Sequence, residues 1–234
     1  MTLLPILTLG FFLGMRHATD SDHVVAVTTI VSREKSIRAA SLVGALWGIG
    51  HTLTILIVGG AIIVFGIVLP ARVGLTMEFS VALMLVLLGL FNVLGFRREW
   101  KTLRAHHHGV QGPTPATLLG RIGFYRVARS LVVGVVHGLA GSAAVALLVL
   151  ATLQNATWAL LYLFLFGIGT VAGMMLITSA MAVPLVYGAR QFAGWNRHIG
   201  WMTGVLSVAF GLLLVYQIGF VEGLFLSTPR FTPQ

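Results

Sequence analysis

The chain has 234 residues, of which 57% are hydrophobic and only 9% are charged, and its mean hydropathy is +0.96. This composition excludes a water-soluble domain with one buried core. The sequence contains no cysteine, which excludes disulfides, thiolate metal sites, iron–sulfur clusters and cysteine nucleophiles. The net charge of +9 comes from basic residues that lie mostly between apolar stretches, so we interpret it as a topology signal and expect no nucleic-acid partner.

Six apolar stretches are each long enough to cross a hydrocarbon core of about 30 Å. They cover residues 3–31, 40–69, 77–96, 130–153, 159–188 and 199–221. The sequence therefore predicts an all-α, polytopic membrane protein with six transmembrane helices in contact with the lipid bilayer. The N-terminus lacks the basic region of a cleavable signal peptide, so we expect the first stretch to remain in the mature protein.

The basic residues are distributed unequally between the two sides that six spans would create. One side receives only Arg72 and Arg230, and the positive-inside rule then predicts that both termini lie outside the cytoplasmic membrane. The long connection 97–129 contains His106, His107 and His108 and is predicted to be a cytoplasmic loop, where the histidines would either capture metal or be merely solvated.

The two halves of the chain resemble each other at a spacing of 119 to 120 residues. Gly14 and His17 match Gly134 and His137, and the Gly-Ile-Gly at 48–50 matches the one at 167–169. These matches divide the chain into a first three-helix repeat (1–96) and a second one (130–234). An odd number of spans in each repeat would give the copies opposite orientations, which is the inverted repeat of many secondary transporters.

The first apolar stretch is interrupted by the segment 16–23, Arg-His-Ala-Thr-Asp-Ser-Asp-His, near mid-membrane. Ionisable groups at that depth cost a few kcal/mol each, so they mark a functional site. Two imidazoles beside two carboxylates suit a borderline divalent cation such as nickel, cobalt or zinc, whereas calcium or magnesium would prefer oxygen ligands alone.

The residues leave open which carboxylate binds the metal. On an unbroken helix His17, Asp20 and His23 share one face, which makes Asp20 the ligand. However, Asp20 is also four residues from Arg16, and a salt bridge between them would leave Asp22 to bind the ion or to orient a histidine.

The helix could also end and begin again within this segment. Thr19 and Asp22 have the spacing of a capping box, which marks a helix start. Unwinding of the preceding turn would then let all four metal-binding side chains converge, as in the broken helices of transporters.

Two further histidines lie in other apolar stretches. His51, next to Gly48 and Gly50 in the second stretch, is expected at a depth comparable to that of His23 and is predicted to be a ligand. His137, the repeat-mate of His17, would complete the site, form a second metal station, or only donate a hydrogen bond between helices.

The stretch Arg16–Val24 resembles the signature helix of the nickel/cobalt transporter (NiCoT) family, which reads Arg-His-Ala-x-Asp-Ala-Asp-His followed by an aliphatic residue. Only Ser21 differs. Gly50-His51-Thr52 is similar to the family's second motif. This resemblance implies that five residues are required to move Ni²⁺ or Co²⁺ across a bacterial cytoplasmic membrane: His17, Asp20, Asp22, His23 and His51. The chain lacks acidic residues of the family's later motifs, so it resembles a divergent, shortened member.

We therefore expect a secondary transporter of Ni²⁺ or Co²⁺, most simply for uptake, with no cofactor other than the transported ion. The alternatives are an efflux permease, or a metal-binding accessory protein for a nickel enzyme that does not transport. No Walker-type loop is present, and a dication moving inward gains about 4.6 kcal/mol per 100 mV, so no ATPase partner is implied. We expect no enzymatic activity, and a homo-oligomer is compatible with the sequence.

Overall fold

The computed structural model describes residues 3–32, 34, 36–67, 69–105, 127–140, 155–191, 195–227 and 229. Within these ranges the regular structure is helical and contains no strand. The helices are α1 (Leu3–His17), α2 (Ser21–Val31), α3 (Ile37–Thr54), the π-helix η1 (Ile55–Gly59), α4 (Gly60–Phe65), α5 (Ala71–Ala105), α7 (Ala156–Gln191), α8 (Trp195–Tyr216) and the π-helix η2 (Gln217–Val221). A further apolar helix is described over Val127–Ala140.

Among the described residues, four continuous helical segments are long and apolar enough to cross a bilayer: Ile37–Phe65, Ala71–Gly95, Ala156–Gly188 and His198–Val221. Ser21–Val31 and Val127–Ala140 are shorter apolar helices. The prediction of an all-α, polytopic membrane protein is confirmed. The first predicted stretch is two helices, α1 and α2, separated by a break at 18–20. Of the fourth stretch, the structure describes residues up to 140.

Helix α5 continues to Ala105 and so extends into the region 97–129, for which the sequence predicts a cytoplasmic connection. The change from apolar to basic residues at Arg97 therefore marks where α5 leaves the apolar region and not where its helix ends. His106, His107 and His108 lie outside the described residues.

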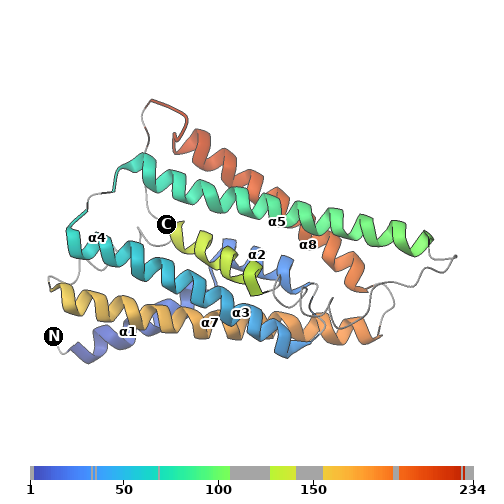
Figure 1. Ribbon diagram of the computed structural model, residues 1–234, viewed down its shortest axis with the longest axis horizontal. Coiled ribbons are helices and arrows are strands. Elements are labelled where there is room, and N and C mark those ends of the chain that lie inside the picture. Colours follow the sequence, from blue (N-terminus) through green and yellow to red (C-terminus); the bar gives the residue numbers. More distant parts are fainter. Residues whose placement is uncertain are drawn as a thin grey trace.

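The helices form two layers with short helices between them (Figure 1). One layer is the pair α5 and α8, which pack along each other, and the other contains α1 and α3, both packed along α7. Helix α2 lies between the layers and contacts both α5 and α8 as well as α7. The buried core that joins the layers includes Val27, Trp47, Leu85 and Met174.

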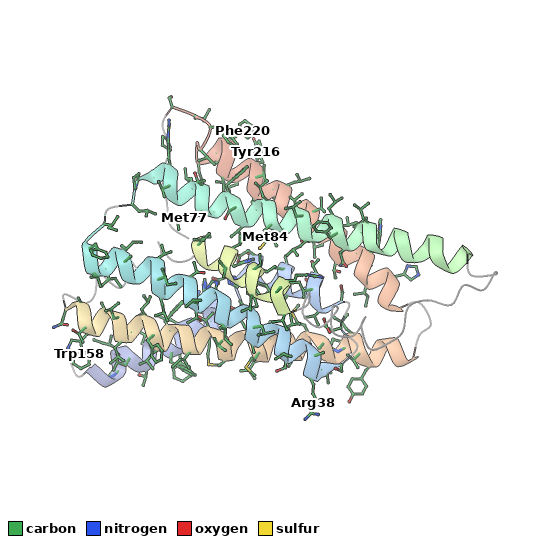
Figure 2. The ribbon with its side chains drawn as sticks, viewed as in Figure 1. Arg38, Met77, Met84, Trp158, Tyr216 and Phe220 are labelled. Atoms are coloured by element: carbon green, nitrogen blue, oxygen red, sulfur yellow. The ribbon has the colours of Figure 1, made fainter. Side chains whose placement is uncertain are left out.

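Side chains on the outside of the bundle are largely apolar. Tyr216 and Phe220 point away from the other helices, with 63% and 55% of their surfaces exposed, and Phe12 is 64% exposed (Figure 2). Such a surface is unfavourable in water and suits contact with lipid acyl chains.

Close helix crossings depend on glycine. Gly14 of α1 lies against the backbone of α7, where an added methyl group would be 3.0 Å from the Thr170 nitrogen. Gly134 lies against α3, where the same methyl group would be 2.9 Å from the His51 nitrogen. Small residues allow such backbone approach between membrane helices. The crossings bring α1, α3 and the helix 127–140 close enough for their histidines to meet.

Candidate metal site

Backbone hydrogen bonds of a turn accompany the break between α1 and α2. The carbonyl of Arg16 accepts a bond from the Thr19 nitrogen at 2.7 Å, and the Asp20 carbonyl accepts one from the Val24 nitrogen at 3.0 Å as α2 begins. The helix therefore ends and begins again, which was one of the alternatives left open by the sequence. The turn places His17 and His23 on two different helices that converge.

The predicted capping box does not form. Asp20 occupies the N-cap of α2 with extended backbone angles, but its side chain makes no capping bond. The Thr19 hydroxyl donates to the Arg16 carbonyl at 2.6 Å instead. Asp20 is committed elsewhere, because its Oδ2 lies 2.7 Å from His17 Nδ1. The Asp20 carboxylate, which could have capped the start of α2, therefore contacts the imidazole of His17.

Three histidines from three helices meet beside this turn. His17 of α1, His23 of α2 and His51 of α3 can each offer a ring nitrogen such that all three atoms lie within 4.8 Å of one another. The exposed fractions are 16% for the His17 side chain and 2% and 0% for His23 and His51. His17 Nε2 lies 3.1 Å from His51 Nε2. Two nitrogens bound to one ion at about 2.0–2.1 Å would be about 2.9–3.4 Å apart, so this spacing fits a shared metal ion.

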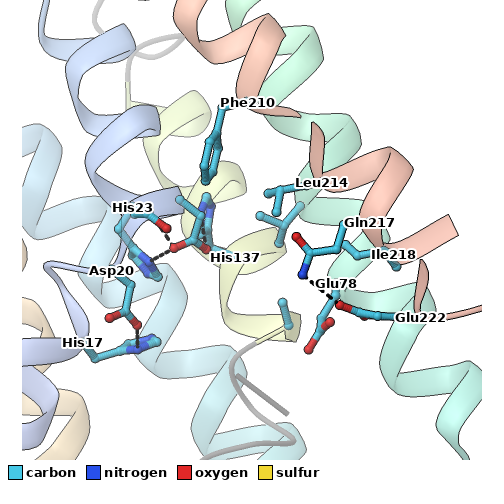
Figure 3. Close-up of a pocket in the computed structure, with 14 residues that line it drawn as sticks. His17, Asp20, His23, Glu78, His137, Phe210, Leu214, Gln217, Ile218 and Glu222 are labelled. Carbon is cyan, nitrogen blue, oxygen red and sulfur yellow. Dashed lines mark hydrogen bonds and ion pairs between the residues drawn. The ribbon is translucent and has the colours of Figure 1, made fainter. Parts of the chain in front are cut away.

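The two aspartates hold the outer nitrogens of these rings. His17 Nδ1 faces Asp20, and His23 Nδ1 lies 3.0 Å from Asp22 Oδ1 (Figure 3). A carboxylate that accepts a bond from Nδ1–H fixes the tautomer and leaves Nε2 with a lone pair for a metal, which is the usual outer arrangement around metal-bound histidines. The salt bridge considered between Arg16 and Asp20 is not needed for this arrangement, since Asp20 already has a partner.

A second group of donors adjoins the first and shares His23 with it. Asp22, His23 and His137 can also place one ligand atom each within 4.8 Å of one another. His137 Nε2 lies 3.4 Å from Asp22 Oδ2, and the rings of His23 and His137 have centroids 4.6 Å apart. Asp22 therefore contacts two histidines, whereas Asp20 is in neither donor group and contacts only His17 in the set.

Several nitrogens of this cluster are buried without a hydrogen-bond partner among the residues that the structure describes. They are His23 Nε2, His51 Nδ1 and His137 Nδ1. A buried polar atom left without a partner costs about 1–3 kcal/mol, so each one indicates a missing water, proton or ion. His23 Nδ1 already contacts Asp22, so a metal ion shared with the other imidazoles of the first group would satisfy Nε2.

Aromatic rings close the cluster on its apolar side. Trp47 is fully buried and stacks on His23 with ring centroids 5.9 Å apart and planes 7° apart. Phe166 of α7 contacts His17, with centroids 5.5 Å apart. These rings exclude water from one side of the imidazoles, which strengthens the binding of an ion there.

The other side of the cluster opens into a cavity of about 310 Å³. His17, Asp20, Asp22, His23 and His137 line it, and so do Glu78 of α5, Gln217 of η2 and Glu222 (Figure 3). The last three residues were missed by the sequence analysis. An isolated acidic residue at each of two apolar stretches, Glu78 in the third and Glu222 just after the sixth, is the signal that could have revealed them.

Comparison with curated proteins gives one close relative of nearly the same length. The chain is 41% identical over 225 residues to the urease accessory protein UreH of Bacillus sp. (strain TB-90), which covers 95% of this chain and 96% of the relative. No protein-family model matches the chain, and no solved structure matches it.

Proposed function

This chain belongs to the family of the urease accessory protein UreH, and from that premise we propose that it carries Ni²⁺ across the cytoplasmic membrane through its histidine cluster. The relative's name connects it with urease, which is a nickel enzyme, so nickel is the first choice of ion and Co²⁺ the second. The resemblance of residues 16–24 and 50–52 to the nickel/cobalt transporter motifs supports the same choice.

One observation carries the proposal: three imidazoles from three helices converge, two of them buried and that of His17 partly buried, and aspartates hold the Nδ1 atoms of His17 and His23. Neutral nitrogen donors with carboxylates behind them suit borderline divalent metals. A structural site would bury its ion completely, but this cluster lies beside a cavity, so an ion could be exchanged. Transport requires such exchange.

We propose that movement of the two layers against each other exposes the site alternately. Helix α2, which carries Asp22 and His23, packs against both layers, and Asn92 of α5 donates to carbonyls of Thr29 at 3.2 Å and of Gly200 at 2.9 Å. Any displacement of α5 and α8 would therefore pull on the helix that holds two donors. This coupling connects the movement of the layers to the release of the ion.

The inverted repeat remains part of the proposal. The contacts of Gly14 with Phe166 and Thr170 match those of Gly134 with Trp47 and His51 at the same 119- to 120-residue spacing, which supports a division into 1–96 and 130–234. With both termini outside, an inside-negative potential would drive the dication inward by about 4.6 kcal/mol per 100 mV without ATP. Uptake is the proposed direction.

Flux measurements in proteoliposomes of defined voltage test the function. Wild-type protein should take up Ni²⁺, and His17→Ala and His23→Ala should each lower uptake more than about 100-fold, because each removes a nitrogen ligand. His198→Ala, on an exposed position of α8, is the matched control and should retain uptake. Full uptake by both site variants would refute the assigned roles.

Flux in proteoliposomes and metal accumulation in cells together separate the competing functions. Tight Ni²⁺ binding without flux in wild-type vesicles would identify a metal-binding accessory protein. Accumulation in cells that falls on expression of the protein would identify efflux.

A further inference from the structure

The wall of the cavity opposite the histidines carries its own acidic side chains. Glu78 projects from α5 and Glu222 directly follows η2, so both belong to the layer formed by α5 and α8 (Figure 3). Gln217 Nε2 donates a hydrogen bond to Glu222 Oε1 at 3.2 Å. The histidines come from the other layer and the short helices, so the acidic group and the histidine group lie on different helices.

The charges on this wall are not balanced by a nearby base. Glu78 lines the same cavity as Glu222 and Asp22. Among the described residues that line the cavity there is no lysine or arginine. Carboxylates in an apolar region are costly unless they are paired, hydrated or bound to a cation, and unpaired ones mark ion pathways.

One carboxylate oxygen on this wall is buried and lacks a partner. Glu222 is 9% exposed, and its Oε2 accepts no hydrogen bond from any residue in the described part of the chain. His23 Nε2 and His137 Nδ1, on the facing wall, are unpartnered in the same sense. These unpartnered atoms belong to residues that line one cavity on both sides, which indicates a mobile polar occupant and not a structural ion pair.

We propose that Glu78 and Glu222 form a second cation station, which receives the hydrated divalent metal ion before imidazoles replace its waters. This inference rests on the proposed transport function. Oxygen donors bind a hydrated dication without selecting strongly among metals. A water occupies about 30 Å³ of liquid, so the cavity of 310 Å³ has room for an ion with its first-shell waters.

The acidic station and the histidine cluster would have different roles because their donor atoms differ. The carboxylates concentrate divalent cations of any kind by charge, and the nitrogen donors of the histidine cluster then select nickel or cobalt. Glu78 lies near the beginning of α5 and Glu222 near the end of the last span, so both lie toward the side that is outside in the proposed topology. The station is therefore on the entry side for uptake.

Uptake at low nickel concentration tests the station. The double variant Glu78→Gln/Glu222→Gln keeps the size of both side chains and removes their charge, and we expect its Ni²⁺ uptake in proteoliposomes to fall at least tenfold. Glu34→Gln, which makes the same change away from the cavity, should stay within twofold of wild type. Glu78→Asp/Glu222→Asp should recover a substantial part of the lost uptake. Uptake within twofold of wild type by the double glutamine variant, or equal loss in the aspartate variant, overturns the proposal.

Calorimetric titration of the purified protein with Ni²⁺ keeps the test independent of flux. Wild type should show a tight and a weak class of sites. The double glutamine variant should lose only the weak class, and His51→Ala should weaken only the tight class. Absence of the weak class in wild type, or loss of the tight class in the glutamine variant, overturns the station. Absence of flux in wild type with both classes intact would instead overturn the transport function alone.

Discussion

Two helix crossings in this molecule share the same backbone contacts but carry different side chains. In the first, Gly14 of α1 lies against the Phe166 carbonyl and the Thr170 nitrogen of α7. In the second, Gly134 lies against the Trp47 carbonyl and the His51 nitrogen of α3. The reciprocal contacts also correspond, because Gly169 lies against Phe11 and Met15 while Gly50 lies against Leu131 and Val135.

The chemistry of the two crossings is unequal. An aromatic ring next to a histidine occurs in both, with centroids 5.5 Å apart for His17 and Phe166 and 5.2 Å apart for His137 and Trp47. At the next corresponding position, however, α3 has His51 and α7 has Thr170, whose hydroxyl donates to the Phe166 carbonyl at 2.9 Å. Glycine contacts thus set the helix positions in both crossings, and a few polar substitutions decide where an ion can bind.

The largest effect is expected from overpacking either crossing. Gly14→Leu and Gly134→Leu would each insert a branched side chain where even a methyl group meets backbone within about 3 Å. Backbone cannot move aside as a side chain can, so each variant should lose about 3 kcal/mol or more of stability and yield little folded protein. Thermal unfolding and size-exclusion profiles in detergent measure this.

Gly60→Ala is the matched control for that comparison. A methyl group there would meet only Leu160 Cδ2 at 3.5 Å, which is an ordinary contact. Its unfolding temperature should remain near that of wild type. If Gly14→Leu and Gly134→Leu unfold at the wild-type temperature, the crossings do not depend on close approach.

The sequence predicted the parts of this arrangement that depend on local pattern. Apolar length revealed the membrane helices, and ionisable residues at membrane depth revealed the segment around His17 and His23. The roles of the two aspartates could not be predicted, because helical periodicity applies only to an unbroken helix and the chain breaks at 18–20. With the break, Asp20 turns back to His17, while Asp22 is shared by two rings.

The acidic wall illustrates the other limit of sequence reasoning. Glu78 and Glu222 are 144 positions apart and do not belong to one sequence motif. Only the packing of α5 along α8 brings them to one cavity. The meeting of His137 with Trp47 likewise depends on the approach of two backbones at Gly134 and Gly138. Such contacts between distant segments depend on tertiary packing and cannot be predicted from local periodicity.

Replacement of the side chains that differ between the crossings should give the next largest effect. His51→Ala removes a ligand of the first donor group and should lower Ni²⁺ uptake more than about 100-fold. Thr170→Val, at the corresponding position of α7, removes only a hydroxyl bonded within its own helix and should leave uptake within about twofold. Uptake by proteoliposomes compares the two, and an equal loss in both variants would contradict a ligand role for His51 that Thr170 does not share.

A smaller effect is expected from His137, which shares the second crossing with His51. His137 lies in the second donor group with Asp22 and His23 but not in the group of three imidazoles that includes His17. His137→Ala should therefore leave the tight site occupied and lower uptake only about tenfold, at the lower end of the losses for outer-shell partners of metal sites. Its repeat-mate variant His17→Ala should abolish tight binding. Titration with Ni²⁺ distinguishes the two, because loss of tight binding in His137→Ala would mean that one ion is shared by all four imidazoles.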